Sequence, residues 1–95
     1  MAQSTADVRT ESASRYLQQL CKHWSHKLVT EFDPDKGRVD FSSGAQLFLE
    51  ADSTDLHLKL EAPEDSLERM ESVVADHLKR FAFREALEFN WSRHV

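Results

Sequence analysis

The feature that most constrains this chain is a run in which leucine occupies every second position. Leu56, Leu58 and Leu60 alternate with polar residues over the segment 56–61. Successive side chains of a β-strand point to opposite faces of the sheet, so this pattern predicts a strand with one buried face and one wet face. A sheet built around such a strand is expected to be covered on one side only.

The residues around this run predict further strands joined by tight turns. Segments 29–32 and 38–42 flank the sequence DPDKG at 33–37, which is suited to reversing the chain. Segment 45–51 is expected to pair with 56–62 around a turn at 52–55. A weaker alternation predicts a short first strand over 6–11, whereas residues 1–5 are small and polar and are expected to be disordered.

Two other segments have apolar residues at helical spacing. Ser12 is a candidate N-cap for a helix predicted over 13–27. Pro63 precedes a second helix predicted over 64–81, where Glu64 and Asp65 suit the positive end of the helix dipole. The apolar faces consist of Tyr16, Leu17, Leu20, Cys21, Trp24 and Leu28 in the first helix and of Leu67, Met70, Val74, Leu78 and Phe81 in the second.

The order strand, helix, four strands, helix predicts an α+β fold. Both helices are expected to pack on one face of an antiparallel sheet of four to five strands, within a single domain over 6–95. Segment 87–91 predicts either a final strand or a C-terminal extended segment. The opposite face of the sheet is expected to be open and to carry Arg38, Asp40, Gln46, Phe48, Glu50, His57, Lys59 and Glu61.

Composition narrows the class of function. The chain has 12 Lys and Arg against 17 Asp and Glu, a formal net charge of -5, which argues against nucleic acid as a partner. No segment has the roughly 20 apolar residues that span a membrane, and the first residues are not an apolar leader. The single cysteine cannot form an intramolecular disulfide, so a cytoplasmic location is expected. A chain of 95 residues is compatible with either a monomer or a homodimer.

The residues best suited to chemistry cluster on the first predicted helix, where Cys21, His23 and His26 lie within six residues. Cys21 and His23 point about 160° apart on a regular helix, so they do not share one ion. His23 and His26 are three residues apart and can share a face. His77, on the second helix, is the candidate third ligand of a zinc or iron site made by His23, His26 and His77.

Each of these residues also has a plainer interpretation. His77 projects near the centre of an apolar stripe, where a core histidine would bond to a carbonyl or a carboxylate. A buried Cys21 would act as a small hydrophobic residue. Arg84 and Glu85 predict either a salt-bridged helix end or a contact to an anion. Phe48, an aromatic residue among charges, is either a contact point or an ordinary exposed residue.

Motifs of the common enzyme classes are absent from the sequence. There is no Gly-rich phosphate loop, HExxH, CxxC or Gly-x-Ser-x-Gly element. Whether the chain is an enzyme therefore stays open, with a non-enzymatic role favoured.

Several stretches resemble a bacterial family catalogued as domain of unknown function 2218. They are YLQQLCKHWSHK at 16–27, DHLKRFAFRE at 76–85 and LEFNW at 87–91, with GRVDF at 37–41 and LEA at 49–51. The similarity extends over nearly the whole chain from Val8 onward. It implies a fold of the TATA-binding-protein type, which says nothing of DNA binding. The resemblance also implies a link to iron handling, because relatives of the domain occur alongside siderophore-interacting reductases.

Together these observations predict a small binding or accessory module linked to iron or siderophore handling. Its expected partner is a protein or a siderophore-related small molecule, and neither nucleic acid nor a membrane. The alternative is a small metal-binding enzyme or metallochaperone that holds zinc or iron on helix-borne histidines. The candidate binding residues are Cys21, His23, His26, Phe48, His77, Arg84 and Glu85.

Overall fold

The computed structural model describes residues 2–94, which form six strands and two helices. The strands make one antiparallel sheet in the order β2-β3-β4-β5-β1-β6. The predicted α+β class and element order are confirmed, with one strand more than expected. The elements are β1 (Ala2–Arg9), α1 (Ala13–Trp24), β2 (Val29–Phe32), β3 (Lys36–Asp40), β4 (Gln46–Ala51), β5 (Asp55–Ala62), α2 (Glu64–Phe81) and β6 (Ser92–His94).

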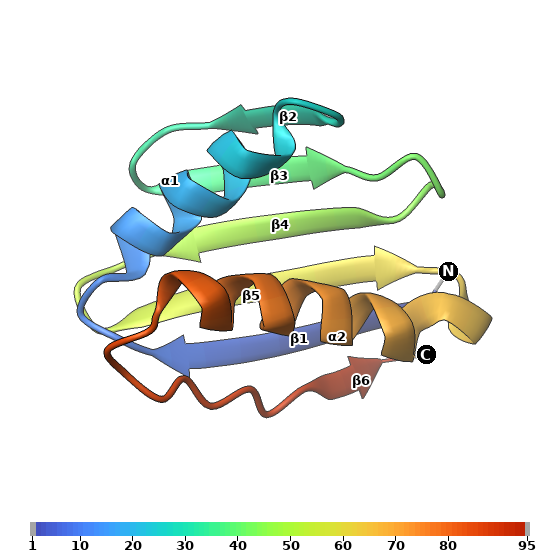
Figure 1. Cartoon of the computed structure of the whole chain (residues 1–95). Helices are drawn as coiled ribbons and strands as arrows, with labels where there is room; N and C mark the ends of the chain where they lie inside the picture. The colour runs from blue at the N-terminus through green and yellow to red at the C-terminus, as the bar shows by residue number, and fades with distance from the viewer. Residues whose placement is uncertain (1, 95) are drawn as a thin grey trace.

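Both helices lie on the same face of the sheet, as Figure 1 shows. α1 crosses β2, β3 and β4, whereas α2 lies over β5 and β1, and the two helices touch each other. The predicted two-layer packing is therefore confirmed, and no helix within residues 2–94 covers the second face. Neither helix of this range is long and apolar enough to cross a membrane. The likeness to the TATA-binding-protein type of fold stays a prediction.

The leucine alternation determines which face is covered. In the β4–β5 register, Leu47 is opposite Leu60 and Leu49 is opposite Leu58, so all four side chains point toward the helices. Each is at most 2% exposed, and burying one leucine contributes roughly 1.5–3 kcal/mol. From the helices, the fully buried side chains that complete this core are Leu17, Leu20, Cys21, Val74 and Leu78.

The first strand begins earlier than predicted. Residues 2–5 were expected to be disordered, yet Ala2 pairs with Ala62 and the strand continues to Arg9. Ala2, Ser4, Ala6 and Val8 are buried in alternation, so their small side chains follow the sheet pattern despite their low hydrophobicity. That expectation was wrong for residues 2–5, and Met1 lies outside the described residues.

The first helix and the C-terminal segment also depart from the predicted boundaries. α1 ends at Trp24 instead of residue 27, where the amides of Lys27 and Leu28 both donate to the Trp24 carbonyl. Segment 87–91 is irregular, and the last strand is β6 at 92–94, which pairs with β1. Aromatic side chains still hold this segment in place, because Phe89 and Trp91 stack at 6.3 Å and pack against the core.

A buried carboxylate connects β1, α2 and β6. Glu71 of α2 is 5% exposed and accepts a hydrogen bond from the Ser4 hydroxyl at 2.5 Å. Arg93 of β6 donates to the same carboxylate through Nε at 3.1 Å and through Nη2 at 2.8 Å. Burial alone would raise the pKa of Glu71, but the bonds from Arg93 and Ser4 outweigh it and keep the pKa below its ordinary value. The carboxylate thus fixes a short polar strand that hydrophobicity would not hold.

Gly37 allows α1 to lie close to β3. A Cβ atom at this position would lie 2.9 Å from Cys21 Sγ and 3.2 Å from Leu17 Cδ2. Contacts this short are not tolerated without a shift of the helix or of the side chains. The DPDKG turn sequence therefore ends with a glycine because of the packing above it.

We predict that Gly37→Ala lowers the free energy of unfolding by about 1–3 kcal/mol, because the added methyl group overpacks the space beneath α1. Urea unfolding followed by circular dichroism measures the change. Lys36→Ala on the same strand is the control and should change stability little, since this side chain is exposed. Adding Cys21→Ala should reduce the cost of Gly37→Ala; equal costs in both backgrounds would contradict the proposed contact.

Candidate functional site

The structure brings together two of the three predicted histidines. The rings of His23 on α1 and His77 on α2 have centroids 5.5 Å apart. Nδ1 of His77 lies 2.7 Å from the Val73 carbonyl oxygen, so Nδ1 carries a proton and donates it to this carbonyl. Trp24 packs against His77 at 5.0 Å. The cluster therefore lies in the contact between the two helices, with Trp24 buried, His77 half-buried and His23 exposed.

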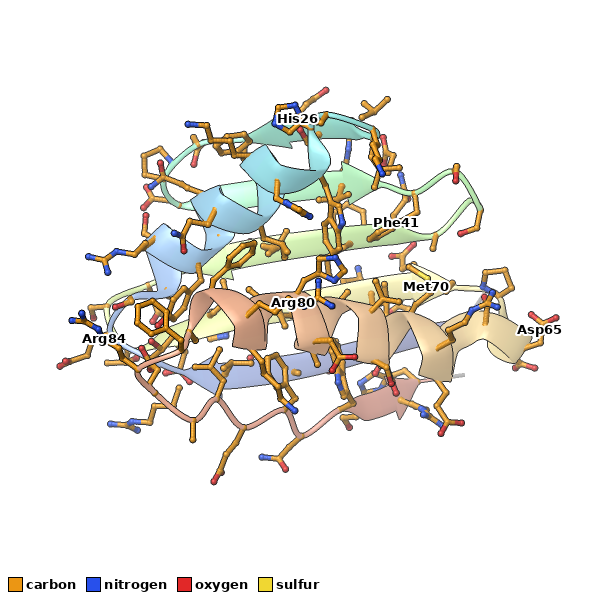
Figure 2. The ribbon with its side chains drawn as sticks, viewed as in Figure 1. His26, Phe41, Asp65, Met70, Arg80 and Arg84 are labelled. Carbon is orange, nitrogen blue, oxygen red and sulfur yellow. The ribbon has the colours of Figure 1, made fainter. Side chains whose placement is uncertain are left out.

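The predicted ligand set of His23, His26 and His77 does not form. His26 follows the end of α1, and Figure 2 shows it over β2, away from α2 where Arg80 is labelled. Within residues 2–94, no three His, Cys, Asp or Glu side chains are grouped to hold a metal ion. The prediction had extended the helix to residue 27, whereas α1 ends at Trp24, so His26 does not follow the helical face of His23.

Cys21 is fully buried beneath α1, next to the position of Gly37. Burial raises the pKa of its thiol to about 11. The thiolate is the reactive form of cysteine, so Cys21 has the properties of a small core residue.

Arg84 and Glu85 separate into two different environments. The hydroxyl of Tyr16 donates to Glu85 Oε2, which ties the segment after α2 to α1. Burial, together with this carboxylate, raises the pKa of Tyr16. Arg84 is exposed beyond the end of α2, and its guanidinium lies 5.4 Å from the Phe83 ring centroid. Glu85 thus has a structural partner, and Arg84 does not join it in one site.

Phe48 lies on the uncovered face of the sheet, as predicted. It is the middle of three cross-strand neighbours, with Arg38 of β3 on one side and Lys59 of β5 on the other. Lys59 Nζ is 5.6 Å from the Phe48 ring centroid, within the range of a cation–π interaction. Phe48 is half-buried, and its long neighbours supply that cover.

The charges around Phe48 are mostly paired with one another. Arg38 Nη2 lies 3.2 Å from Glu31 and 3.4 Å from Asp40. Lys59 Nζ lies 3.4 Å from Glu61 Oε2. Nε of Arg38 is buried and has no hydrogen-bond partner within the described part of the chain. The face therefore presents one aromatic side chain inside a ring of paired charges, with the Nε–H of Arg38 buried beneath it and unpaired.

His57 lies next to Phe48 on this face and contacts two carboxylates. Nδ1 of His57 lies 2.6 Å from Asp7 Oδ1, and Nε2 lies 2.7 Å from Asp52 Oδ2. Hydrogen bonds to Asp7, and then to Asp52, raise the pKa of His57 to about 9. The pKa of Asp52 is correspondingly lowered, first by His57 and then by the amides of Thr54 and Asp55. At neutral pH His57 is a cation with both nitrogens engaged.

Sequence reasoning placed His57 on the open face but missed its two carboxylates. Asp52 is five residues away in the turn before β5, so its proximity was foreseeable from that turn. Asp7 lies opposite His57 in the β1–β5 register, fifty residues away in sequence. Only the register of two distant strands identifies that contact.

Beside Phe48 the surface is hollowed to a volume of about 250 Å³. Its lining comes from β1, β4 and β5 and combines charged and polar side chains with the apolar surface of Phe48 and Leu58. The residues include Thr5, Asp7, Phe48, Glu50, His57 and Lys59.

Comparison with known proteins gives this chain a family. The sequence model of a family described as "Uncharacterized protein conserved in bacteria (DUF2218)" matches residues 5–92. The chain belongs to this family. The match to DUF2218 confirms the resemblance found in the sequence, and none of the curated proteins matches.

A solved structure supports the fold of this DUF2218 chain. The NMR structure of PA4090 from Pseudomonas aeruginosa is 47% identical in sequence and superimposes with a TM-score of 0.80. The similarity covers 97% of this chain and 96% of that one. The two chains therefore share their architecture over essentially their whole length.

We predict that His57 titrates with a pKa near 9, which ¹H–¹⁵N NMR of the imidazole resolves. Asp7→Asn and Asp52→Asn should each lower this pKa, because each removes a carboxylate that favours the imidazolium. The folded pKa is above the unfolded value, so the stabilisation is fully present below about pH 6.5 and is lost as the pH rises through 9. An unchanged pKa in both variants would contradict the assigned contacts.

Proposed function

We propose that this chain is a non-enzymatic binding module that holds a protein partner on the uncovered face of its sheet, around Phe48. The observation that carries the proposal is the position of Phe48, an aromatic side chain between Arg38 and Lys59 on the face that no described helix covers. Protein interfaces are enriched in aromatic residues and arginine at their centre and have a polar rim. The paired charges around Phe48 have the character of such a rim.

The charged side chains of the face favour a macromolecule over a small ligand. Small-molecule sites are concave, mostly apolar cavities of about 300–1,000 Å³. Two hollows border Phe48, of about 250 Å³ and about 460 Å³, and most of the residues that line each of them are charged or polar. A siderophore-related small molecule is therefore the less favoured of the two predicted partners. A surface with one aromatic anchor among paired charges suits a second protein better.

The state of the reactive side chains argues for binding instead of catalysis. Both ring nitrogens of His57 are occupied by carboxylates, so neither is free to accept a proton from a substrate. Burial raises the pKa of Cys21 to about 11 and keeps the thiol protonated. These two groups would otherwise be the first candidates for acid–base and nucleophilic chemistry.

The alternative function, binding of zinc or iron, would depend on His23 and His77. Structural zinc sites use four protein ligands and catalytic sites use three. Two imidazoles fall short of either set, and His26 lies elsewhere. The sheet face is for this reason the preferred site. A cytoplasmic location stays a prediction. A link to iron or siderophore handling also stays a prediction, since neither the family description nor the name of the similar structure mentions iron.

We predict that a photo-crosslinking residue at Phe48 captures a protein partner in living bacteria that carry the chain. p-Benzoylphenylalanine at this position extends from the centre of the proposed interface and reacts on irradiation with whatever lies against it. The matched control is the same residue at Phe83, which is 79% exposed and lies after α2. Gel shift and mass spectrometry identify the adducts.

A discrete adduct from position 48 that is absent from position 83 is the expected result. Arg38→Glu should weaken that adduct, because it removes the guanidinium next to Phe48. The same adducts from both positions, or none from position 48, would contradict a partner on this face.

A further inference from the structure

The two edges of the sheet are protected very differently. The edge strand β6 has three residues, all polar, and Arg93 within it is tied to Glu71. Short, charged edges of this kind discourage pairing with another chain. The other edge strand, β2, has no lysine or proline, and its Val29 and Phe32 are 61% and 41% exposed. An apolar edge of this type is a template for a further strand.

The backbone of β2 has its free hydrogen-bonding groups at two defined residues. The amide of Asp33 donates to the Lys36 carbonyl at 2.8 Å, which makes these two residues a hydrogen-bonded pair. Bonded and non-bonded pairs alternate along an antiparallel ladder, so Thr30 and Phe32 occupy non-bonded positions opposite β3. Their N–H and C=O groups consequently point away from β3, toward the open edge.

We propose that β2 pairs in antiparallel fashion with β2 of a second copy of this chain, with Thr30 at the two-fold axis. Such an axis is normal to the sheet, so opposed residues must face the same side. That condition leaves two registers near the middle of the strand, one centred on Thr30 and one on Glu31. The charges of the segment distinguish them.

The charge of Glu31 favours the Thr30 register. That register sets Val29 of each copy opposite Glu31 of the other, so that no like charges of β2 face each other. The Glu31 register would put two Glu31 carboxylates directly opposite each other, about 4.5–5.5 Å apart at Cβ, which is destabilising. Of the two registers, only the one centred on Thr30 avoids this repulsion.

An exposed apolar side chain lies at the same edge. Phe32 is 41% exposed and faces the side of the sheet that carries the helices. Phe32 also borders a hollow of about 640 Å³ along the outer side of α1, between the helix and the edge. The α1 helices of both copies would flank the two-fold axis and enclose this space. The hollow is lined by Arg15, Gln18, Gln19, Lys22, Ser25 and Phe32.

The consequence for binding is a surface larger than one chain offers. Six strands from each copy would form one continuous sheet, with the uncovered faces on the same side. The two Phe48 anchors would then be displayed on a single surface. This self-association uses the edge and not the face, so it stands or falls independently of a partner at Phe48.

Sedimentation velocity over a concentration series tests the association with the full chain. The wild type should shift from monomer to dimer with rising concentration. Thr30→Pro removes the outward N–H from each copy and should raise the dissociation constant by roughly tenfold or more. Thr30→Ser keeps the N–H and should behave as the wild type. A wild type that stays monomeric, or a folded Thr30→Pro that dimerises unchanged, overturns the proposal.

A pair of single-cysteine variants tests the register and decides the matter if Thr30→Pro fails to fold. In a Cys21→Ala background, Thr30→Cys should form an intermolecular disulfide, because opposed Cα atoms lie about 5.5 Å apart. Glu31→Cys should crosslink far more slowly. Faster crosslinking at Glu31→Cys, or equal crosslinking at both positions, overturns the Thr30 register.

Discussion

The alternation of leucine with polar residues in β4 and β5 is the constraint on which the rest of the structure depends. Leu47, Leu49, Leu58 and Leu60 all point to one side, and their burial requires that both helices pack there. In the part of the chain that the structure describes, no comparable apolar row points to the other side, where charged side chains surround Phe48. One pattern thus explains the covered face, the uncovered face and the close approach of α1 to α2.

Polar contacts and one glycine fix the positions of those elements that the leucines do not determine. Glu71 holds β1 and β6 through Ser4 and Arg93, and Gly37 sets how closely α1 approaches β3. On the other side of the sheet, charges neutralise one another instead of being buried. The fold therefore separates a structural face, where reactive groups such as Cys21 are buried, from a face suited to contact with other molecules.

The sequence predicted those parts of the fold that have a strong hydrophobic period. The leucine alternation and the two amphipathic helices identified the fold class, the shared helix face, the position of Phe48 and the proximity of His23 to His77. The weakly hydrophobic strands were harder to predict from the sequence. Residues 2–5 belong to a strand of small side chains, and β6 is held by Arg93 and by its pairing with β1. The position of His26 was not predicted correctly because α1 ends at Trp24, before this residue. The Asp7–His57 contact was missed because it depends on the register between two strands that are far apart in the sequence.

The central claim is that one face of this sheet is buried and the other is open around Phe48. Solvent paramagnetic relaxation by a soluble gadolinium chelate measures this directly, proton by proton, in the unmodified protein. The account predicts strong relaxation of Lys59 side-chain and Phe48 ring protons, with the methyl groups of Leu47, Leu49 and Leu58 protected. Equal protection of Phe48 and Leu58 would contradict it, because the face assigned as open would then be covered.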